Sequence, residues 1–325
     1  MRAEPLVRVM RSGVEESVHL GHVAVCDADG RLIASAGDPG QIVFARSCMK
    51  PLQTAVSLAA IGDLRLSDRE IAVMSASHNA EPIHLGAVRA LLKRAGLGPS
   101  ALRTPPAWPL DEQEMARAHH PNPQFHDCSG KHAGMLLACV RAGWDPSTYP
   151  QRSHPLQRRV LRAVQRGIGA DVVATGVDGC GIPVHAVPLA AMATLYARLA
   201  DAERMAPLAE QTDRAVEAML TEPYLVGGRD RDDTALMQAA GDVMAKEGAE
   251  ALDCAVSLSS GLGVAVKIAD GGSRAAGPAL LDTLAQLDVL DDRQLAVLAG
   301  RLRPPVQGGG ATVGVLEPAF TLRRR

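Results

Sequence analysis

The chain has few aromatic side chains and no large excess of charge of either sign. Phe, Tyr and Trp make up 2% of the 325 residues, and the formal net charge is -2. Scarce aromatics argue against a platform that stacks bases or sugars, and a nucleic-acid-binding protein would be clearly basic. The 47% of hydrophobic residues must therefore build a core mainly from Ala, Leu and Val.

Long apolar runs and closely spaced cysteines are also missing. The longest apolar stretches, such as Leu189–Leu195, are far shorter than the ~20 residues that a membrane span needs. The N-terminal residues carry scattered charges and lack the apolar segment of a signal peptide. We therefore expect a cytoplasmic protein whose six cysteines are buried, bind metal or act in catalysis, and do not form disulfides.

The order of the predicted elements indicates an α+β fold. Asp29-Gly30 is a hairpin signal between two strands in 18–37, a buried strand is expected at 172–177, and strand patterns also cover 254–258, 264–268 and 311–316. Helical patterns fill most of the middle of the chain, near 47–59, 67–76, 83–95, 156–165, 189–200, 207–220 and 234–246. The first of these helices carries Leu52, Val56 and Ala59 on one apolar face. Ser67 and Glu70 form a capping box, and 101–123 reads as a long loop.

Regular β-α-β alternation is absent from this order. This order predicts an antiparallel or mixed sheet with a helical insertion. The length allows two domains or one large domain, and we expect an antiparallel sheet flanked by helices in a single domain over 1–325, with a mainly helical region at about 50–250.

The segment Ser47-Cys-Met-Lys50 is a Ser-x-x-Lys pattern at a predicted helix start. Residues three apart lie on the same face of a helix, so the hydroxyl and the amine can meet. The positive end of the helix dipole favours an alkoxide and disfavours a protonated lysine, and a neutral lysine can act as the base for a serine nucleophile. By itself the pattern is common, and a helix-start serine with a surface lysine is the alternative.

Two further motifs follow in the order seen in serine β-lactamases and penicillin-binding proteins. They are Ser77-His-Asn79 and Lys246-Glu-Gly248. That chemistry needs a second Ser–Lys pair to move protons and to hold the charged end of the substrate. Lys267, in the strand pattern 264–268, is a rival for Lys246. A simple helix-end turn at 77–79 and a solvated lysine at 246 are the structural alternatives.

A third group of residues points to a metal. It comprises His126-Asp-Cys128-Ser-Gly-Lys131-His132 and Asp178-Gly-Cys180. Two cysteines with nearby histidines can hold zinc, and ligand chemistry alone favours Cys128, Cys180 and either His126 or His132. Lysine is a poor ligand by the same reasoning, because its amine must first lose a proton with a pKa of about 10.4. Two cysteines buried in tight turns are the alternative.

The polar loop 229–234 contains two arginines that could bind a substrate carboxylate. An N-cap with solvated charges explains the same loop. His78 and Glu81 lie close to Ser77 in the sequence and could simply shape a pocket.

Four blocks together resemble the rhizobial-type L-asparaginases, also called the asparaginase II or class 3 family. The blocks are residues 46–53, 75–81, 126–134 and 175–183, and the resemblance extends from about 10 to 320. Members of that family are similar in fold to serine β-lactamases and bacterial glutaminases. The run 245–250 also resembles the Lys-x-Gly block of glutaminases.

The resemblance implies an amidohydrolase that converts L-asparagine to L-aspartate and ammonia. It implies Ser47 as nucleophile, Lys50 as its base, and Ser77 with Lys246 as the second pair. The zinc ligands of the family fall on Cys128, Lys131 and Cys180, so Lys131 replaces the histidine that ligand chemistry alone favours. Asp178 would orient that site. Substrate contacts are expected from Arg46, His78, Asn79 and Arg231.

Several points stay open at this level. A glutaminase or a β-lactam-type serine hydrolase would use the same machinery, and an inactive zinc-containing amino-acid sensor is a candidate of a different class. We expect a homodimer that acts on a small-molecule substrate. Binding to nucleic acid or to a membrane is not expected.

Overall fold

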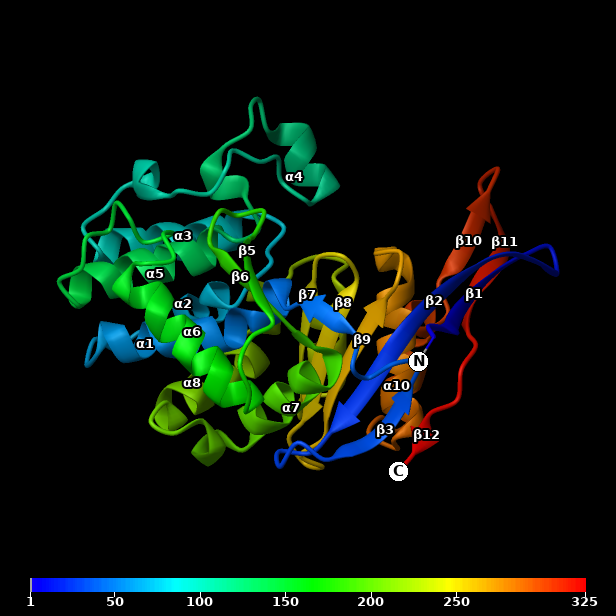
Figure 1. The fold of residues 1–325 in the computed structure, drawn as a ribbon. Helices are drawn as coiled ribbons and strands as arrows, with labels where there is room; N and C mark the ends of the chain where they lie inside the picture. Colours follow the sequence, from blue (N-terminus) through cyan, green and yellow to red (C-terminus); the bar gives the residue numbers. More distant parts are fainter. Residues whose placement is uncertain (1) are drawn as a thin grey trace. The chain divides into compact units, whose positions relative to one another are not determined.

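Strands from both ends of the chain form one nine-stranded sheet in the computed structural model, which describes residues 2–325. The strand order is β10-β11-β1-β2-β9-β8-β7, with β3 beside β2 and β12 beside β3. Figure 1 shows the N-terminal strands in blue next to the C-terminal strands in red. The strands are β1 (Glu4–Arg11), β2 (Val14–Cys26), β3 (Leu32–Ala36), β7 (Val243–Gly248), β8 (Leu252–Ser257), β9 (Gly263–Ile268), β10 (Pro305–Gly308), β11 (Ala311–Pro318) and β12 (Arg323–Arg324).

The predicted hairpin in 18–37 is confirmed. Strands β2 and β3 pair antiparallel, and Gly30 at their turn has a φ of 84°, a value that glycine adopts without strain. The strands predicted at 254–258 and 264–268 are β8 and β9, which pair with each other, and β9 also pairs with the central strand β2. The α+β class predicted from the order of elements is therefore correct.

The chain divides into two compact units. The sheet unit contains the residues up to 48, 187–201 and 235–325, and the helical unit contains 49–186 and 202–234. In the sheet unit, every residue of β8 is buried, which means that both faces of the sheet are covered there. Helices α7 (Leu189–Ala200) and α10 (Ala276–Gln286) pack against β8 and β9. The expectation of a single domain stays a prediction.

The remaining elements of the sheet unit are short. They are β4 (Ile42–Phe44), the 3₁₀ helices η1 (Arg46–Met49) and η6 (Ser273–Ala275), α11 (Asp292–Val297) and α12 (Ala299–Leu302).

The helical unit is built around α1 (Lys50–Ile61), ten of whose residues are buried. It packs against α5 (Ser129–Arg141), α6 (Pro155–Ile168) and α8 (Ala209–Thr221). Helix α2 (Asp68–Met74) begins at the predicted capping box, in which both reciprocal hydrogen bonds are present. The unit also contains α3 (Pro82–Arg94), α4 (Glu112–Arg117) and the hairpin of β5 (Ala174–Val177) and β6 (Pro183–Pro188).

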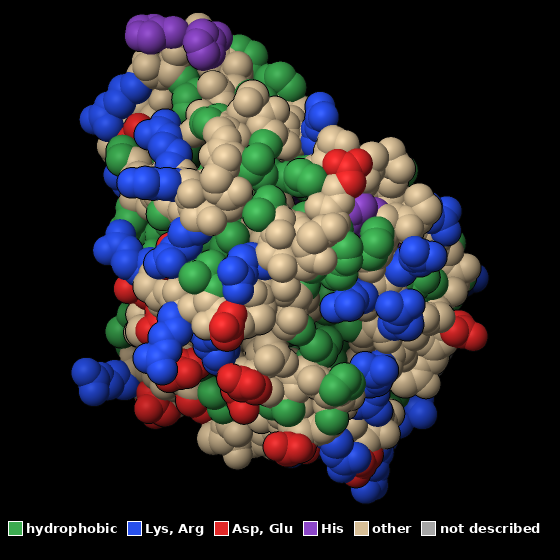
Figure 2. All heavy atoms as spheres, turned by 90° about the vertical axis from the view of Figure 1, so that its left-hand side faces the viewer, with side chains coloured by type: hydrophobic (Ala, Val, Ile, Leu, Met, Phe, Trp, Pro, Cys, Tyr) green, Lys and Arg blue, Asp and Glu red, His purple; other side chains and the backbone are tan. Residues whose placement is uncertain are grey.

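The helices of this unit are amphipathic. On α6, Val160 and Val164 are buried while Arg159 and Arg162 are exposed, as the 3.6-residue period requires. Figure 2 shows one face of the molecule, on which Lys and Arg side chains are interspersed with hydrophobic and acidic ones. Among residues 2–325, no helix combines the length and the apolarity that crossing a membrane requires.

One predicted helix was too long. The pattern 234–246 forms α9 (Asp232–Ala239), and the chain then enters β7, which contains Lys246. Gly241 lowers the helical tendency at that point, and Val243 begins a buried run that pairs with β8. Sheet pairing therefore decided the end of this segment, and Lys246 lies in a strand instead of at a helix end.

Three smaller predictions also need correction. The strand at 172–177 is not buried, since it forms the hairpin strand β5, and Val177 is 74% exposed. The loop at 101–123 contains the short helix α4, which begins at an Asp111 N-cap. Ala59, expected on the buried face of α1, is exposed.

Candidate active site

Lys50 and Ser77 meet inside the helical unit. Lys50 is the first residue of α1, followed by Pro51 in the first turn, and its side chain has no exposed surface. Its Nζ atom donates hydrogen bonds to Ser77 Oγ at 2.8 Å and to the carbonyl of Ala76 at 2.6 Å. Helix α2 ends at Met74, so residues 75–79 leave the helix and run past Lys50. The structure thus joins one member of each predicted Ser–Lys pair.

Ser47 is held in the sheet unit through its neighbour Cys48. Ser47 lies in η1, which continues without a break into α1, and it is buried. The Cys48 thiol donates to the carbonyls of Lys246 at 3.2 Å and Leu252 at 3.0 Å. The hydroxyl of Tyr196 donates to the Cys48 carbonyl at 2.9 Å. These bonds fix η1, and with it Ser47, to the end of the sheet that carries Lys246.

Arg46, the first residue of η1, has a φ of 43°, which is uncommon for a residue with a side chain. Its side chain is partly exposed.

The two candidate second lysines have different surroundings. Lys246 is fully buried in β7, opposite Cys254 of β8. Lys267, in β9, is half-buried, and its ammonium group donates to the backbone carbonyls of Glu250 and Ile268. A lysine that serves as a backbone brace at a strand end is a poor candidate for proton transfer, which favours Lys246.

His78 is completely buried, and both of its ring nitrogens are used inside the protein. Nδ1 accepts a hydrogen bond from the Ala80 N–H at 3.1 Å, so Nε2 carries the proton and donates it to Ser129 Oγ at 2.9 Å. Burial lowers the pKa of His78 well below its usual value, and the ring stacks on His84. These contacts favour a role in shaping the turn at 77–79 over direct contact with substrate.

Asn79 and Arg231 line a polar pocket of about 430 Å³ in the helical unit. Arg231 donates from one nitrogen to the Ser77 carbonyl at 3.1 Å and to Asn79 Oδ1 at 3.3 Å. The other lining residues are Leu110, Asp111, Glu112, Gln113, Arg229 and Asp230. The arginine loop predicted from the sequence therefore lies directly beside the Ser-x-Asn motif.

A buried carboxylate, Glu81, holds this pocket together. It accepts hydrogen bonds from the Tyr224 hydroxyl at 2.6 Å and from the Arg229 N–H at 2.9 Å. Gly228, with a φ of 114°, lies so close that a Cβ atom there would come within 2.4 Å of Glu81. Arg229 also pairs with Asp111 at 3.0 Å. In the sequence, Glu81 was notable only because it lies near Ser77. Asp111 was not notable, except that aspartate is a common N-cap residue.

The three predicted metal ligands lie together in the helical unit. Cys128 is the N-cap of α5, Lys131 is in its first turn, and Cys180 follows β5. All three side chains are buried. The Lys131 ammonium group donates to Cys180 Sγ at 3.2 Å, and Cys180 lies 3.5 Å from Asp178 Oδ2.

The electrostatics of this cluster are those of one thiolate beside one ammonium. A hydrogen bond from Cys128 and the charge of Lys131 together outweigh burial and lower the pKa of the Cys180 thiol to about 6. The same hydrogen bond and burial raise the pKa of the Cys128 thiol well above its usual value. Burial opposes the charge of Lys131, but the neighbouring thiols outweigh it and raise its pKa. Two sulfur donors and a primary amine at one buried point form a donor set that fits zinc better than magnesium or calcium.

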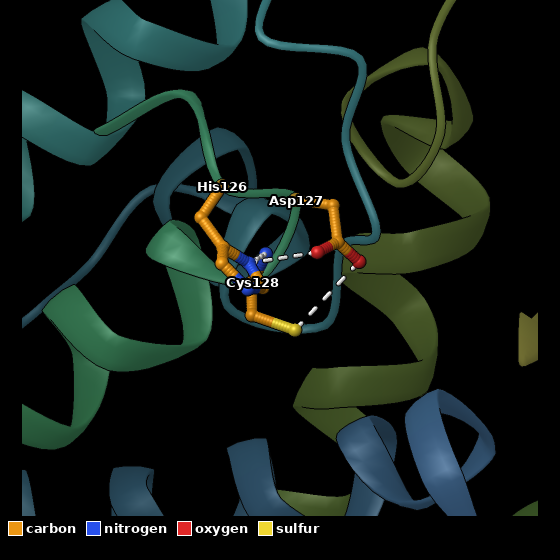
Figure 3. A group of neighbouring side chains, drawn as sticks. All are labelled: His126, Asp127 and Cys128. Atoms are coloured by element: carbon orange, nitrogen blue, oxygen red, sulfur yellow. Dashed lines mark hydrogen bonds and ion pairs between the residues drawn. The ribbon is translucent and has the colours of Figure 1, made fainter. Parts of the chain in front are cut away.

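A second set of possible donors shares Cys128 with this cluster and consists of His126, Asp127 and Cys128 (Figure 3). His126 Nδ1 pairs with Asp127 Oδ1 at 2.8 Å, and although burial opposes its charge, this contact raises the pKa of His126 to about 9. His132 points elsewhere, because its Nδ1 bonds the hydroxyl of Tyr149 at 2.6 Å. The nitrogen that donates a hydrogen bond to Cys180 Sγ is that of Lys131.

Solved structures with some likeness to this chain are distant. They include a β-lactamase from Mycobacterium bovis at 16% identity, covering 86% of this chain and 94% of that chain with a TM-score of 0.42. A putative β-lactamase from Bacteroides dorei is 12% identical, with 81% and 92% covered and a TM-score of 0.43. A simvastatin synthase variant from Aspergillus terreus is 14% identical, with 76% and 86% covered and a TM-score of 0.40. These values are too low to indicate an activity.

The family comparison is decisive. The family model described as L-asparaginase II matches residues 7–318, so the chain belongs to the L-asparaginase II family. Membership in this family makes the protein a hydrolase of the amidohydrolase class. No curated protein matches the chain.

Proposed function

We propose that the protein hydrolyses L-asparagine to L-aspartate and ammonia through a covalent acyl-serine intermediate. The observation that carries this proposal is the buried hydrogen bond between Lys50 and Ser77, in a chain of the L-asparaginase II family. The Lys50 side chain has no exposed surface, and its nitrogen lies 2.8 Å from the Ser77 hydroxyl oxygen. Such a lysine suits the transfer of a proton to and from a serine hydroxyl.

The first half of the reaction uses Ser47 and Lys50. Ser47 Oγ attacks the side-chain amide carbon of asparagine, and its proton passes to the neutral amine of Lys50. The oxyanion is stabilised by backbone N–H groups at the start of the helix, including that of Ser47. The C–N bond then breaks, the leaving nitrogen takes a proton from the side of Ser77 and Lys246, and ammonia departs.

The second half reverses the roles of the proton carriers. Water attacks the acyl-serine carbon and gives its proton to the Ser77–Lys246 pair, which lost a proton in the first half. The acyl C–O bond breaks, Ser47 regains its hydrogen, and aspartate leaves.

Arg231 and Asn79 are the proposed contacts for the charged end of the amino acid. Both line the polar pocket, and Arg231 is anchored to the carbonyl of Ser77, which ties substrate binding to the position of that serine. Arg46 is a further proposed contact. His78 supports the turn from behind, since its ring nitrogens are already bonded within the protein.

Zinc is the proposed metal, held by Cys128, Lys131 and Cys180, with Asp178 orienting Cys180. When bound, zinc would supply a Lewis-acid point that positions a substrate oxygen or nitrogen. Zinc would not be needed to activate a water molecule as nucleophile, because Ser47 is the proposed nucleophile.

The cysteines bear on the cellular location of the protein. All six are free and buried, which fits a reducing compartment, and we propose a cytoplasmic location. A homodimer is proposed as well, and sedimentation of the purified protein would test it.

An ammonia-release assay on asparagine and on glutamine, beside hydrolysis of a chromogenic cephalosporin, separates the candidate activities. The proposal expects release from asparagine above the other two. Preference for glutamine or cephalosporin would indicate the related hydrolases, and tight amino-acid binding without turnover would indicate a sensor.

The nucleophile is tested by trapping. Rapid acid quenching and intact-protein mass spectrometry should find the acyl group on Ser47, and Ser47→Ala should abolish turnover by several decades while the protein stays folded. Ser77→Ala should lower the rate without removing the acyl-enzyme. Ser57→Ala, which changes a buried serine on α1 that bonds only its own helix at Gln53, is the control and should stay active. An acyl group on Ser77 instead would exchange the roles of the two serines.

A further inference from the structure

Three groups surround the buried Nζ atom of Lys50. This nitrogen donates hydrogen bonds to the Ala76 carbonyl and to Ser77 Oγ. The third group is the carboxylate of Asp127, whose Oδ2 lies 3.6 Å from Lys50 Nζ. Among the described residues of the helical unit, Asp127 is the one carboxylate in ion-pair contact with this lysine.

Asp127 is itself rigidly placed at the start of α5. Its Oδ1 pairs with His126 Nδ1 at 2.8 Å, and its backbone carbonyl accepts the His78 N–H at 3.1 Å. The Cys128 thiol lies 3.7 Å from its Oδ2 (Figure 3). The carboxylate therefore stands between the proposed base and the proposed metal ligands, and it is fixed from both sides.

The other titratable groups that face Lys50 are His78, His132 and the Cys128 thiol. Asp127 is the one carboxylate in this set, and its Oδ2 lies 3.6 Å from the lysine nitrogen. It is thus the negative charge that Lys50 meets when it becomes an ammonium ion.

A base that accepts a proton away from water needs a counter-charge at that moment. In the Ser-His-Asp triad the aspartate supplies it and also fixes the orientation of the base. We propose that Asp127 is the positioning residue for Lys50: its carboxylate aims the amine and stabilises the ammonium ion formed when serine gives up its proton. This inference rests on the proposed function, in which Lys50 is the base.

The test compares Asp127→Asn with the wild type and with Asp63→Asn, which removes a carboxylate that pairs with Arg141 at the surface. The asparagine side chain introduced at position 127 is nearly isosteric with aspartate, so the substitution removes the negative charge and keeps the shape. We expect kcat for asparagine to fall about 10²-fold with KM changed little. Asp63→Asn should match the wild type. Zinc content is measured in every variant, because Asp127 neighbours Cys128.

A second readout does not depend on the natural substrate. The rate at which a fluorophosphonate labels Ser47 is followed by intact mass across pH. Loss of the Asp127 charge destabilises the Lys50 ammonium ion, so the acid limb of the labelling profile should move to lower pH in Asp127→Asn. A purely structural role would lower the plateau without moving the limb.

Three results would overturn the inference. The first is an Asp127→Asn variant with unchanged kcat and an unmoved acid limb. The second is a variant in which only KM rises. The third is a fall in kcat that full loading of the variant with zinc reverses. Failure of the proposed function gives a different pattern, in which Ser47→Ala keeps its activity or Ser47 is not labelled in the wild type.

Discussion

Lys131 donates a hydrogen bond to Cys180 across 3.2 Å, although the two residues are 49 positions apart in the chain. This contact bears on two alternative ligand sets proposed for the metal. Ligand chemistry favoured a histidine as the third zinc ligand, and the family resemblance favoured the lysine. The fold sets the lysine amine against the thiolate and turns His132 towards Tyr149.

The first prediction concerns the metal. Zinc should bind at one ion per chain, and Lys131→Ala should lose it while His132→Ala keeps it, as measured by elemental analysis after dialysis. Lys131 and the Cys128 thiol must lose protons to bind, so affinity should weaken as pH falls. Retention by Lys131→Ala together with loss in His126→Ala would return the third ligand to histidine.

The second prediction concerns the second lysine. Lys246→Met should lower kcat by about 10²-fold or more, because a buried proton carrier is lost. Lys267→Met should change kcat little, since that ammonium group only bonds backbone carbonyls. Thermal unfolding of both variants checks that each is folded. Equal effects, or a larger effect at Lys267, would reassign the role.

The third prediction concerns acid stability. Burial lowers the pKa values of His78 and His84, so both stay neutral in the folded state below pH 6.5. The unfolded chain takes up protons at its histidines near pH 6.5. The unfolded state then binds more protons, and the free energy of unfolding should fall as the pH drops below about 6.5, by up to about 1.4 kcal/mol per pH unit for each histidine.

Urea unfolding at several pH values measures this slope. His84→Gln keeps a donor for the Tyr224 carbonyl and cannot be protonated, so it should flatten the slope relative to the wild type. An unchanged slope would mean that His84 is not held neutral by the fold.

The fourth prediction concerns the glycine at the polar pocket. Gly228→Ala should destabilise the protein by about 2 kcal/mol or more and raise KM, because the φ of 114° is strained for alanine and the new Cβ would meet Glu81. Gly86→Ala is the matched control: Gly86 lies within α3 with nothing near its Cβ position. That substitution should stabilise by about 0.5–1 kcal/mol. Similar unfolding curves for the two variants would contradict the argument.

The sequence by itself determined the local features of this protein. The capping box at Ser67 and Glu70, the Asp29-Gly30 hairpin and helix α7 depend on residues close in the chain, and the structure confirms all three. The motifs around Ser47, Ser77 and Cys128 were also visible, because each is a short run of unusual residue types.

Tertiary structure decided what depends on distant partners. The same local pattern that suggests a helix at 234–246 yields β7 at its end, because pairing with β8 satisfies that backbone within the sheet. Sequence spacing matched Lys50 with Ser47, and only the fold added its contacts with Ser77 and with Asp127. These contacts are short because helix ends and loops far apart in the chain converge on one buried amine, and no local rule encodes such convergence.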